Sequence, residues 1–289
     1  MAKTISILGL GWLGLPLAKS LATKGYKVKG SVTSAEKINS VEDPGIDVSV
    51  VKIEADTIYS SYTDFFKTDI LFINIPPRRI PNIETGYPAQ IAQVLPFITE
   101  NKIGKVIFIS STSVYPETNS EVDENNLPKP EKGSGVACLN AEQILQQQSG
   151  FATTVIRFGG LIGADRNPYR FMQRGVKNGP GQKPINLIHM DDCIGIIHHI
   201  IENEIWGEVI NGCCPIHPTR AEFYHLAAKV VNVDAQEFDE SDDFSFKIVS
   251  SKKLIDKLGY SFKYESPMDY LKEAHPYLFP KGRGKIVKD

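Results

Sequence analysis

Residues Thr4 to Ser20 read TISILGLGWLGLPLAKS, and this stretch decides the fold. It opens on a short apolar run that is typical of a buried strand, followed by glycines and then by leucines at helical spacing. The apolar run is Ile5, Ile7 and Leu8, the glycines are Gly9, Gly11 and Gly14, and the leucines are Leu13, Leu17 and Leu21. The pattern predicts a strand, a tight glycine turn and a helix.

The three glycines stand in G-x-G-x-x-G spacing, and each has its own physical task. Gly9 permits the tight turn, Gly11 lets a pyrophosphate approach the backbone, and Gly14 lets helix and strand pack closely. The N-terminus of the helix adds free N–H groups and a partial positive charge. The stretch therefore predicts a dinucleotide site, with Trp12 and Leu13 beside the cofactor. The alternative is a structural turn in an ordinary α/β sheet.

Length and composition exclude several classes of protein. The chain has 289 residues, is 42% hydrophobic, and has a net charge of -2, which argues against a nucleic-acid binder. It has no apolar run of about 18 residues, and the first strand begins too early to leave room for a signal peptide. Four cysteines without a C-x-x-C pair predict neither a disulfide framework nor a metal site. We expect a reduced, cytoplasmic protein with no membrane partner.

The second strand, Tyr26 to Val32, is expected to end at the ribose of a bound dinucleotide. NAD-selective sites usually place an Asp or Glu there for the ribose 2′-OH. This chain has Thr33 and Ser34, followed by Lys37, so two hydroxyls and an ammonium are available to a 2′-phosphate. The sequence therefore predicts NADP in preference to NAD. The alternative is that Thr33 or Ser34 only caps the next helix.

Later segments alternate between strands and helices. Strands are predicted at Asp47–Glu54, Asp69–Ile75, Lys105–Ile109, Thr153–Phe158, Asn186–His189 and Glu208–Asn211, and helices at Tyr87–Thr99 and at Cys193–Glu202, the latter capped by Asp191 or Asp192. This alternation predicts an α/β fold, a Rossmann-type doubly wound parallel sheet. Ile75 and Pro76, at the end of one strand, are expected to contact the cofactor. Arg78 follows as a candidate for a substrate phosphate or carboxylate, or as part of a solvated loop.

The chain is expected to divide into a sheet domain and a smaller lobe. We predict an NAD(P)-binding domain over residues 1–160, completed by about 186–212, and a substrate-binding lobe and tail over 161–185 and 213–289. Within the lobe, Thr219 and Glu222 fit a capping box that opens a helix to Val231. A short strand is expected at Lys247–Val249, and a short helix, Lys252–Leu258, is closed by Gly259.

Several motifs agree in order with one known family. They are Gly9-x-Gly11-x-x-Gly14, Ser110 to Tyr115, Ala141 to Leu145, Arg157-Phe158-Gly159 and Leu187 to Asp192. With them the chain resembles the extended short-chain dehydrogenase/reductase family, which includes nucleotide-sugar epimerases and dehydratases. The first motif alone also looks like the start of nucleotide-sugar dehydrogenases that use a catalytic cysteine, but the later motifs do not belong to those enzymes.

The resemblance implies a Ser/Thr–Tyr–Lys catalytic arrangement. In that family the tyrosine moves a proton, the lysine lowers the tyrosine pKa, and the serine or threonine orients the substrate oxygen. Here Ser111 stands at the Ser/Thr position, next to Ser110, which is expected to contact the cofactor. Ser134 stands at the tyrosine position and Cys138 at the lysine position. The Tyr-x-x-x-Lys pair is missing, so the chain looks like an atypical member of the family.

Other residues are candidates to replace the missing acid. Tyr115 lies close to Ser111 and is the candidate acid, although packing is the default role of this tyrosine in the family. His189 titrates near neutral pH and is a candidate on the substrate side, or a hydrogen-bonded bridge between sheet and lobe. Cys138 is a nucleophile or, with no activating neighbour in sequence, a small buried residue.

Three functional hypotheses follow. The first is an NADP-linked oxidoreductase or epimerase on a small oxygenated substrate, including nucleotide sugars. The second is a sensor or regulator that binds NAD(P) without turnover, and the third is a structural relic that binds nothing. By resemblance, a homodimer would pair through helices near Tyr87–Thr99 and Leu139–Gln147.

Overall fold

The computed structural model of the protein describes residues 2–41, 43–56, 58–60, 63–77, 81–163, 165–166, 168, 179–235 and 237–273. The chain forms two compact units. The sheet unit comprises Met1–Pro116, Glu124–Phe158 and Cys193–Gly212, and the C-terminal unit comprises Glu117–Asp123, Gly159–Asp192 and Cys213–Asp289. Within the described ranges, no helix is both long and apolar enough to cross a bilayer.

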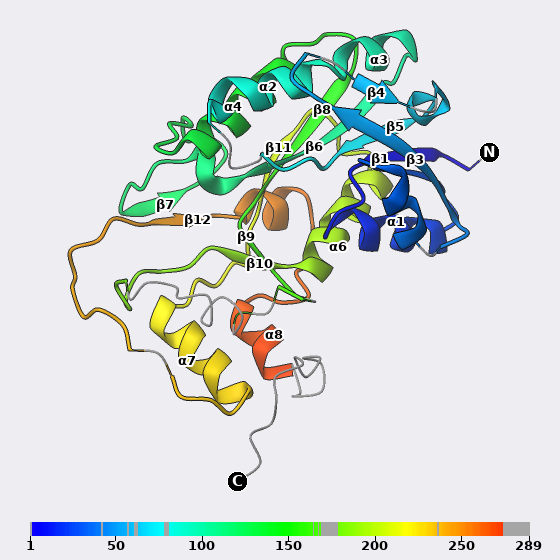
Figure 1. Cartoon of the computed structure of the whole chain (residues 1–289). Coiled ribbons are helices and arrows are strands. Elements are labelled where there is room, and N and C mark those ends of the chain that lie inside the picture. Colours follow the sequence, from blue (N-terminus) through cyan, green and yellow to red (C-terminus); the bar gives the residue numbers. More distant parts are fainter. Residues whose placement is uncertain are drawn as a thin grey trace. The chain divides into compact units, whose positions relative to one another are not determined.

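One large sheet forms the centre of the sheet unit (Figure 1). Its order in the described chain is β11-β8-β6-β5-β1-β2-β3-β4. The strands are β1 Thr4–Leu8, β2 Lys27–Val32, β3 Ile46–Ile53, β4 Ile58–Ser60, β5 Ile70–Ile73, β6 Lys105–Ser111, β8 Ala152–Phe158 and β11 Val209–Gly212. All neighbours pair in parallel except β4, which runs antiparallel to β3. The predicted doubly wound parallel sheet is confirmed.

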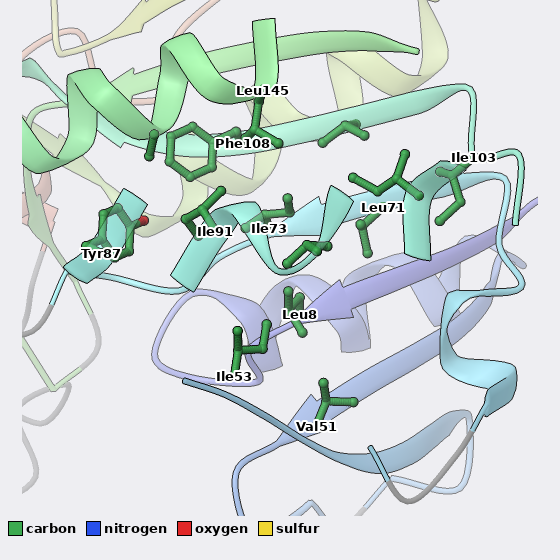
Figure 2. Packing of buried hydrophobic residues seen from close by; sticks show 14 of the residues in the cluster. Leu8, Val51, Ile53, Leu71, Ile73, Tyr87, Ile91, Ile103, Phe108 and Leu145 are labelled. Carbon is green, nitrogen blue, oxygen red and sulfur yellow. The ribbon is translucent and has the colours of Figure 1, made fainter. Parts of the chain in front are cut away.

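Helices cover both faces of this sheet, with α2, α3 and α4 on one face and α1 and α6 on the other (Figure 1). They are α1 Gly14–Thr23, α2 Ile83–Ala92, α3 Leu95–Glu100, α4 Gly133–Gln146 and α6 Met190–Glu202. Figure 2 shows Leu8, Leu71 and Phe108 of the strands packing with Ile91 and Leu145 of the helices. The strand order reverses between β1 and β5, and open α/β sheets bind ligands at such a point.

The predicted helix Tyr87–Thr99 is wrong as one element. The chain forms two helices there, because Pro96 has no N–H to donate to the preceding turn and its ring clashes with it. The proline is instead accommodated in the first turn of α3, where no intrahelical donor is needed.

The C-terminal unit is built from short pieces. Two parallel strand pairs are β9 Gly160–Ile162 with β10 Leu187–His189, and β7 Ser120–Val122 with β12 Lys247–Val249. The helices are α7 Arg220–Val230 and α8 Pro267–Glu273. The predicted capping box is confirmed, since the Thr219 hydroxyl accepts from the Glu222 N–H and the Glu222 carboxylate accepts from the Thr219 N–H. The turn at Lys253–Lys257 is a π-helix, and Gly259 follows it with a φ of 74°.

The predicted cap of the helix Cys193–Glu202 is wrong. Helix α6 begins earlier, at Met190, so Asp191 and Asp192 lie inside its first turn. The buried Asp192 carboxylate instead accepts from the backbone N–H groups of Lys263 and Tyr264, at 2.7 and 3.1 Å. It therefore ties the start of α6 to the segment that precedes α8.

Candidate functional site

The glycine turn between β1 and α1 is shaped by backbone contacts. Gly9 has a φ of 108°, which disfavours a side chain, and a Cβ there would lie 2.9 Å from the Asn74 carbonyl oxygen. A Cβ on Gly14 would lie 2.1 Å from the Gly9 carbonyl oxygen. A Cβ on Gly11 would meet no described atom within 4 Å. Gly9 and Gly14 are therefore required by the fold, whereas the protein itself leaves space at Gly11.

Hydrogen bonds hold the turn against the neighbouring strands. The Gly9 N–H donates to the Ser31 hydroxyl at 2.9 Å, and the Leu10 N–H donates to the Ser31 carbonyl at 2.8 Å. Directly after β5, the Asn74 side-chain amide donates to the Gly9 carbonyl at 3.2 Å. Gly30 of β2 leaves room for Leu10, whose side chain would lie 2.4 Å from a Cβ there. The turn is thus fixed over the switch point between β1 and β5.

A cavity of about 260 Å³ opens beside this turn. It brings together six of the residues that the sequence predicts for the cofactor: Gly9, Gly11, Thr33, Lys37, Ile75 and Pro76. Further lining comes from residues that sequence reasoning missed: Leu8, Leu10, Ser31, Val32, Val51, Lys52, Ile53, Asn74 and Gln90. The alternation of apolar and polar residues along β3 could have predicted which face of that strand is buried. Gln90 carries no local signal, because only the fold brings α2 to this wall.

The charged side chains that line the cavity are those of Lys37 and Lys52. Lys37 donates to the Thr33 hydroxyl at 2.9 Å, and Lys52 also lines the cavity while pairing with Glu54 at 2.7 Å. Among the described lining residues there is no carboxylate. Ser34 precedes the 3₁₀ helix Ala35–Ser40 but makes no side-chain cap bond to the described backbone. These groups suit an anionic ligand.

The remaining predicted cofactor residues lie outside the cavity lining. Trp12 and Leu13 lead into α1, and Leu13 is buried. No described side chain caps this helix, and its first turn contains no acidic residue. The positive end of the helix therefore remains available to phosphates. Ser110 is buried on β6, and its hydroxyl donates to the Glu142 carboxylate.

The family's active-site positions are occupied by residues that cannot reproduce a tyrosine–lysine pair. The Ser111 hydroxyl accepts from the Ser113 N–H at 3.1 Å and is half-buried. Ser134 is exposed in the first turn of α4. Cys138 is buried, and burial together with the nearby Glu142 charge raises the pKa of its thiol to about 12. At neutral pH this position holds an uncharged thiol, neither a cation nor a nucleophilic thiolate.

Tyr115 has its hydroxyl engaged on both sides inside the sheet unit. It donates to the Asn211 side-chain oxygen at 3.0 Å and accepts from an Arg157 guanidinium nitrogen at 2.7 Å. The residue is 1% exposed. Burial raises its pKa more than the Arg157 charge lowers it. This geometry favours the packing role that the resemblance gives as the default.

Arg157 also makes a two-bonded ion pair with Glu142. One guanidinium nitrogen donates at 2.6 Å and the Nε–H at 3.1 Å, to the two carboxylate oxygens. Both side chains are at most 5% exposed. Burial opposes the charge of Arg157, but Glu142 offsets it and the pKa of Arg157 rises. We call Ser110, Tyr115, Glu142, Arg157 and Asn211 the buried polar network.

His189 lies in the C-terminal unit. Its Nδ1 accepts from the Asp191 N–H at 3.1 Å, and its ring packs against Tyr264 and Tyr270. Burial lowers its pKa to about 4, although the Asp191 charge raises it. The ring is therefore neutral with its proton on Nε2, and Nε2 has no partner within the described chain. Arg78, the other predicted substrate contact, falls outside the described residues.

Metal ligands do not gather in the part of the chain that the structure describes. No group of three or more His, Cys, Asp or Glu side chains there could hold an ion. The four cysteines are buried, and none of them is joined to another by a disulfide: Cys138, Cys193, Cys213 and Cys214.

Sequence comparison identifies relatives along most of the chain. The model of an NAD(P)H-binding family matches residues 9–185. Protein YeeZ of Escherichia coli K12 is 31% identical over 269 residues, which are 92% of this chain and 98% of YeeZ. UDP-N-acetyl-D-mannosamine dehydrogenase of Methanococcus maripaludis is 27% identical over 136 residues, which are 42% of this chain and 31% of that enzyme, so the similarity to YeeZ covers far more of both chains.

Solved structures show the same fold. A functionally unknown conserved protein from Silicibacter pomeroyi superposes with a TM-score of 0.78 at 20% identity, covering 94% of this chain and 97% of that one. UDP-glucuronic acid 4-epimerase from Bacillus cereus, in complex with NAD, gives a TM-score of 0.77 at 21% identity over 95% and 98%. At this identity the likeness is one of fold.

Proposed function

The chain belongs to the NAD(P)H-binding family and has an epimerase/dehydratase-like short-chain dehydrogenase fold, and from this premise we propose that it binds NADP(H) beside its glycine turn. We further propose that it uses the cofactor in a redox or epimerisation reaction on a small oxygenated substrate. The oriented residues of the cavity would hold the cofactor, which supplies hydride chemistry when bound.

One observation carries the binding proposal. Gly11 lines the cavity, and a Cβ there would meet no described atom within 4 Å. The packing of the protein therefore does not explain the glycine, whereas close approach of a pyrophosphate does. The uncapped start of α1 supports the same ligand, because its N–H groups and dipole attract phosphate.

The preference for NADP rests on the end of β2. Thr33 and Lys37 are already joined by a hydrogen bond, and Lys52 lies in the same cavity. A 2′-phosphate would accept from these groups with charge assistance, whereas a ribose 2′-OH would meet no carboxylate among the described lining.

Lys37→Ala should weaken NADPH about tenfold and NADH less than twofold, because one charge-assisted bond to the 2′-phosphate contributes roughly 1.5 kcal/mol. Thermal shift with titrated NADP, NADPH, NAD and NADH measures this, since a ligand of the folded state raises the melting temperature. Lys27→Ala, at the opposite end of β2, is the matched control. Equal losses for both cofactors would contradict the NADP assignment, and no shift with any of the four would overturn the binding proposal.

The proposed chemistry centres on Ser111. Its half-buried hydroxyl lies at the end of β6, where it would orient a substrate oxygen. The UDP-glucuronic acid 4-epimerase fold of the Bacillus cereus neighbour makes nucleotide sugars the first substrates to test. Turnover that falls in Ser111→Ala and persists in Ser113→Ala would support this role. Equal activity in both variants would remove Ser111 from the mechanism.

A second candidate is a protein that binds the dinucleotide without turnover. The exposed Ser134 and the uncharged Cys138 favour it, because they supply no equivalent of the tyrosine–lysine pair. Two results together would support this second candidate. NADPH would stay unoxidised over hours with a panel of UDP-sugars, and its binding would change the association of the protein with another protein.

A further inference from the structure

The far wall of the cavity is formed by β3 and α2. Val51, Lys52 and Ile53 line it from β3, and Gln90 lines it from α2. Val51 and Ile53 are at most 5% exposed, so this wall combines two apolar side chains with the Lys52 side chain and the Gln90 carboxamide. Such a wall suits a flat aromatic ring that carries a few polar edge groups.

Gln90 is held in one orientation. Its side-chain nitrogen donates to the Ile53 carbonyl oxygen at 2.6 Å. Because a carbonyl oxygen can only accept, this bond identifies which end of the carboxamide is the NH₂ group. The Gln90 Oε1 atom is then an acceptor, and none of the described residues donates to it. The NH₂ group of the same amide has a second N–H, which the bond to Ile53 does not use.

The cavity residues give the order of the cofactor's parts. In the proposed binding mode, Gly11 would hold the pyrophosphate, and Thr33 with Lys37 would hold the adenosine ribose. In the sheet, β3 is the next strand outward from β2. The base attached to that ribose would therefore reach the wall made by β3 and Gln90.

We propose that Gln90 recognises the adenine base, accepting from its exocyclic amine through Oε1. This rests on the proposed binding of NADP(H), and it adds a specificity residue to that site. An amide side chain matches the donor and acceptor on one edge of adenine. The bond to Ile53 orders the carboxamide before the ligand arrives, which reduces the entropy lost on binding.

The test compares NADPH with its deamino analogue, in which hypoxanthine replaces adenine and an oxygen replaces the amine. Calorimetric titration of the protein should show about tenfold tighter binding of NADPH, since a matched base-edge contact discriminates by roughly 5- to 150-fold. Gln90→Leu should bring the two affinities within about twofold of one another. Gln90→Glu keeps an acceptor and should retain the preference, because the carboxylate repels the hypoxanthine oxygen.

Gln93→Leu is the matched control. Gln93 follows α2, and its side chain also donates to a backbone carbonyl, that of Ala55 at 3.1 Å, but it does not line the cavity. This variant should bind both dinucleotides as the unmodified protein does. Equal affinity of the unmodified protein for the two, or discrimination that survives Gln90→Leu, would overturn the role of Gln90 while leaving NADPH binding intact. Absence of any NADPH binding would overturn both proposals.

Discussion

Arg157→Leu should destabilise the protein by about 3–5 kcal/mol, because it leaves the Glu142 carboxylate buried without a partner charge. Both carboxylate oxygens of Glu142 now accept from Arg157, and Glu142 is fully buried. The variant also removes the donor to the Tyr115 hydroxyl. Urea unfolding followed by circular dichroism measures the loss as a lower midpoint.

The double variant Glu142→Leu with Arg157→Met separates charge from packing. Replacing a buried ion pair by apolar side chains of similar size is often close to neutral, so the double variant should be more stable than Arg157→Leu alone. Tyr115→Phe is the second comparison. It removes one hydroxyl and should cost about 1–2 kcal/mol. Glu142→Leu and Arg157→Met are also measured singly. If the free energy of unfolding that the double variant loses equals the sum of these two single losses, the two charges do not stabilise one another.

This network shows what the sequence could not supply. Arg157 and Glu142 both fall in motifs that carry the family resemblance, yet nothing local predicts that they pair. The partners of Tyr115 lie 42 and 96 residues away along the chain, and only the parallel pairing of β8 with β6 and with β11 in one sheet brings them together. For the same reason the engaged hydroxyl of Tyr115 was not predictable from its closeness to Ser111.

Local patterns were predictive where local chemistry decides the structure. The Thr219–Glu222 capping box and the strand–turn–helix from Thr4 each need only a few consecutive residues. The single helix expected at Tyr87–Thr99 was wrong because apolar spacing continues across Pro96 while the backbone does not. Gln90 was missed because its place in the cavity lining depends on where α2 lies against β3, which the local sequence does not determine.

The second large effect separates two glycines of the first motif. Gly14→Ala should destabilise the protein by about 3 kcal/mol, since its Cβ would lie 2.1 Å from the Gly9 carbonyl oxygen and backbone cannot move aside cheaply. Gly11→Val should leave the unfolding midpoint almost unchanged, because no described atom lies near its Cβ. The valine would instead occupy the cavity and lower NADPH affinity roughly 100-fold, or about 2.7 kcal/mol.

The unfolding midpoint and the NADPH affinity are measured for both variants. We expect Gly14→Ala to lower the unfolding midpoint and Gly11→Val to lower the NADPH affinity. Gly86→Ala on α2 is the control, because its Cβ would also meet no described atom and alanine favours a helix by up to about 1 kcal/mol. It should keep both stability and binding. If Gly11→Val binds NADPH normally, the space at Gly11 does not serve a pyrophosphate. If Gly14→Ala is as stable as Gly86→Ala, the helix does not need its close approach to the turn, and the structural explanation of the motif fails with it.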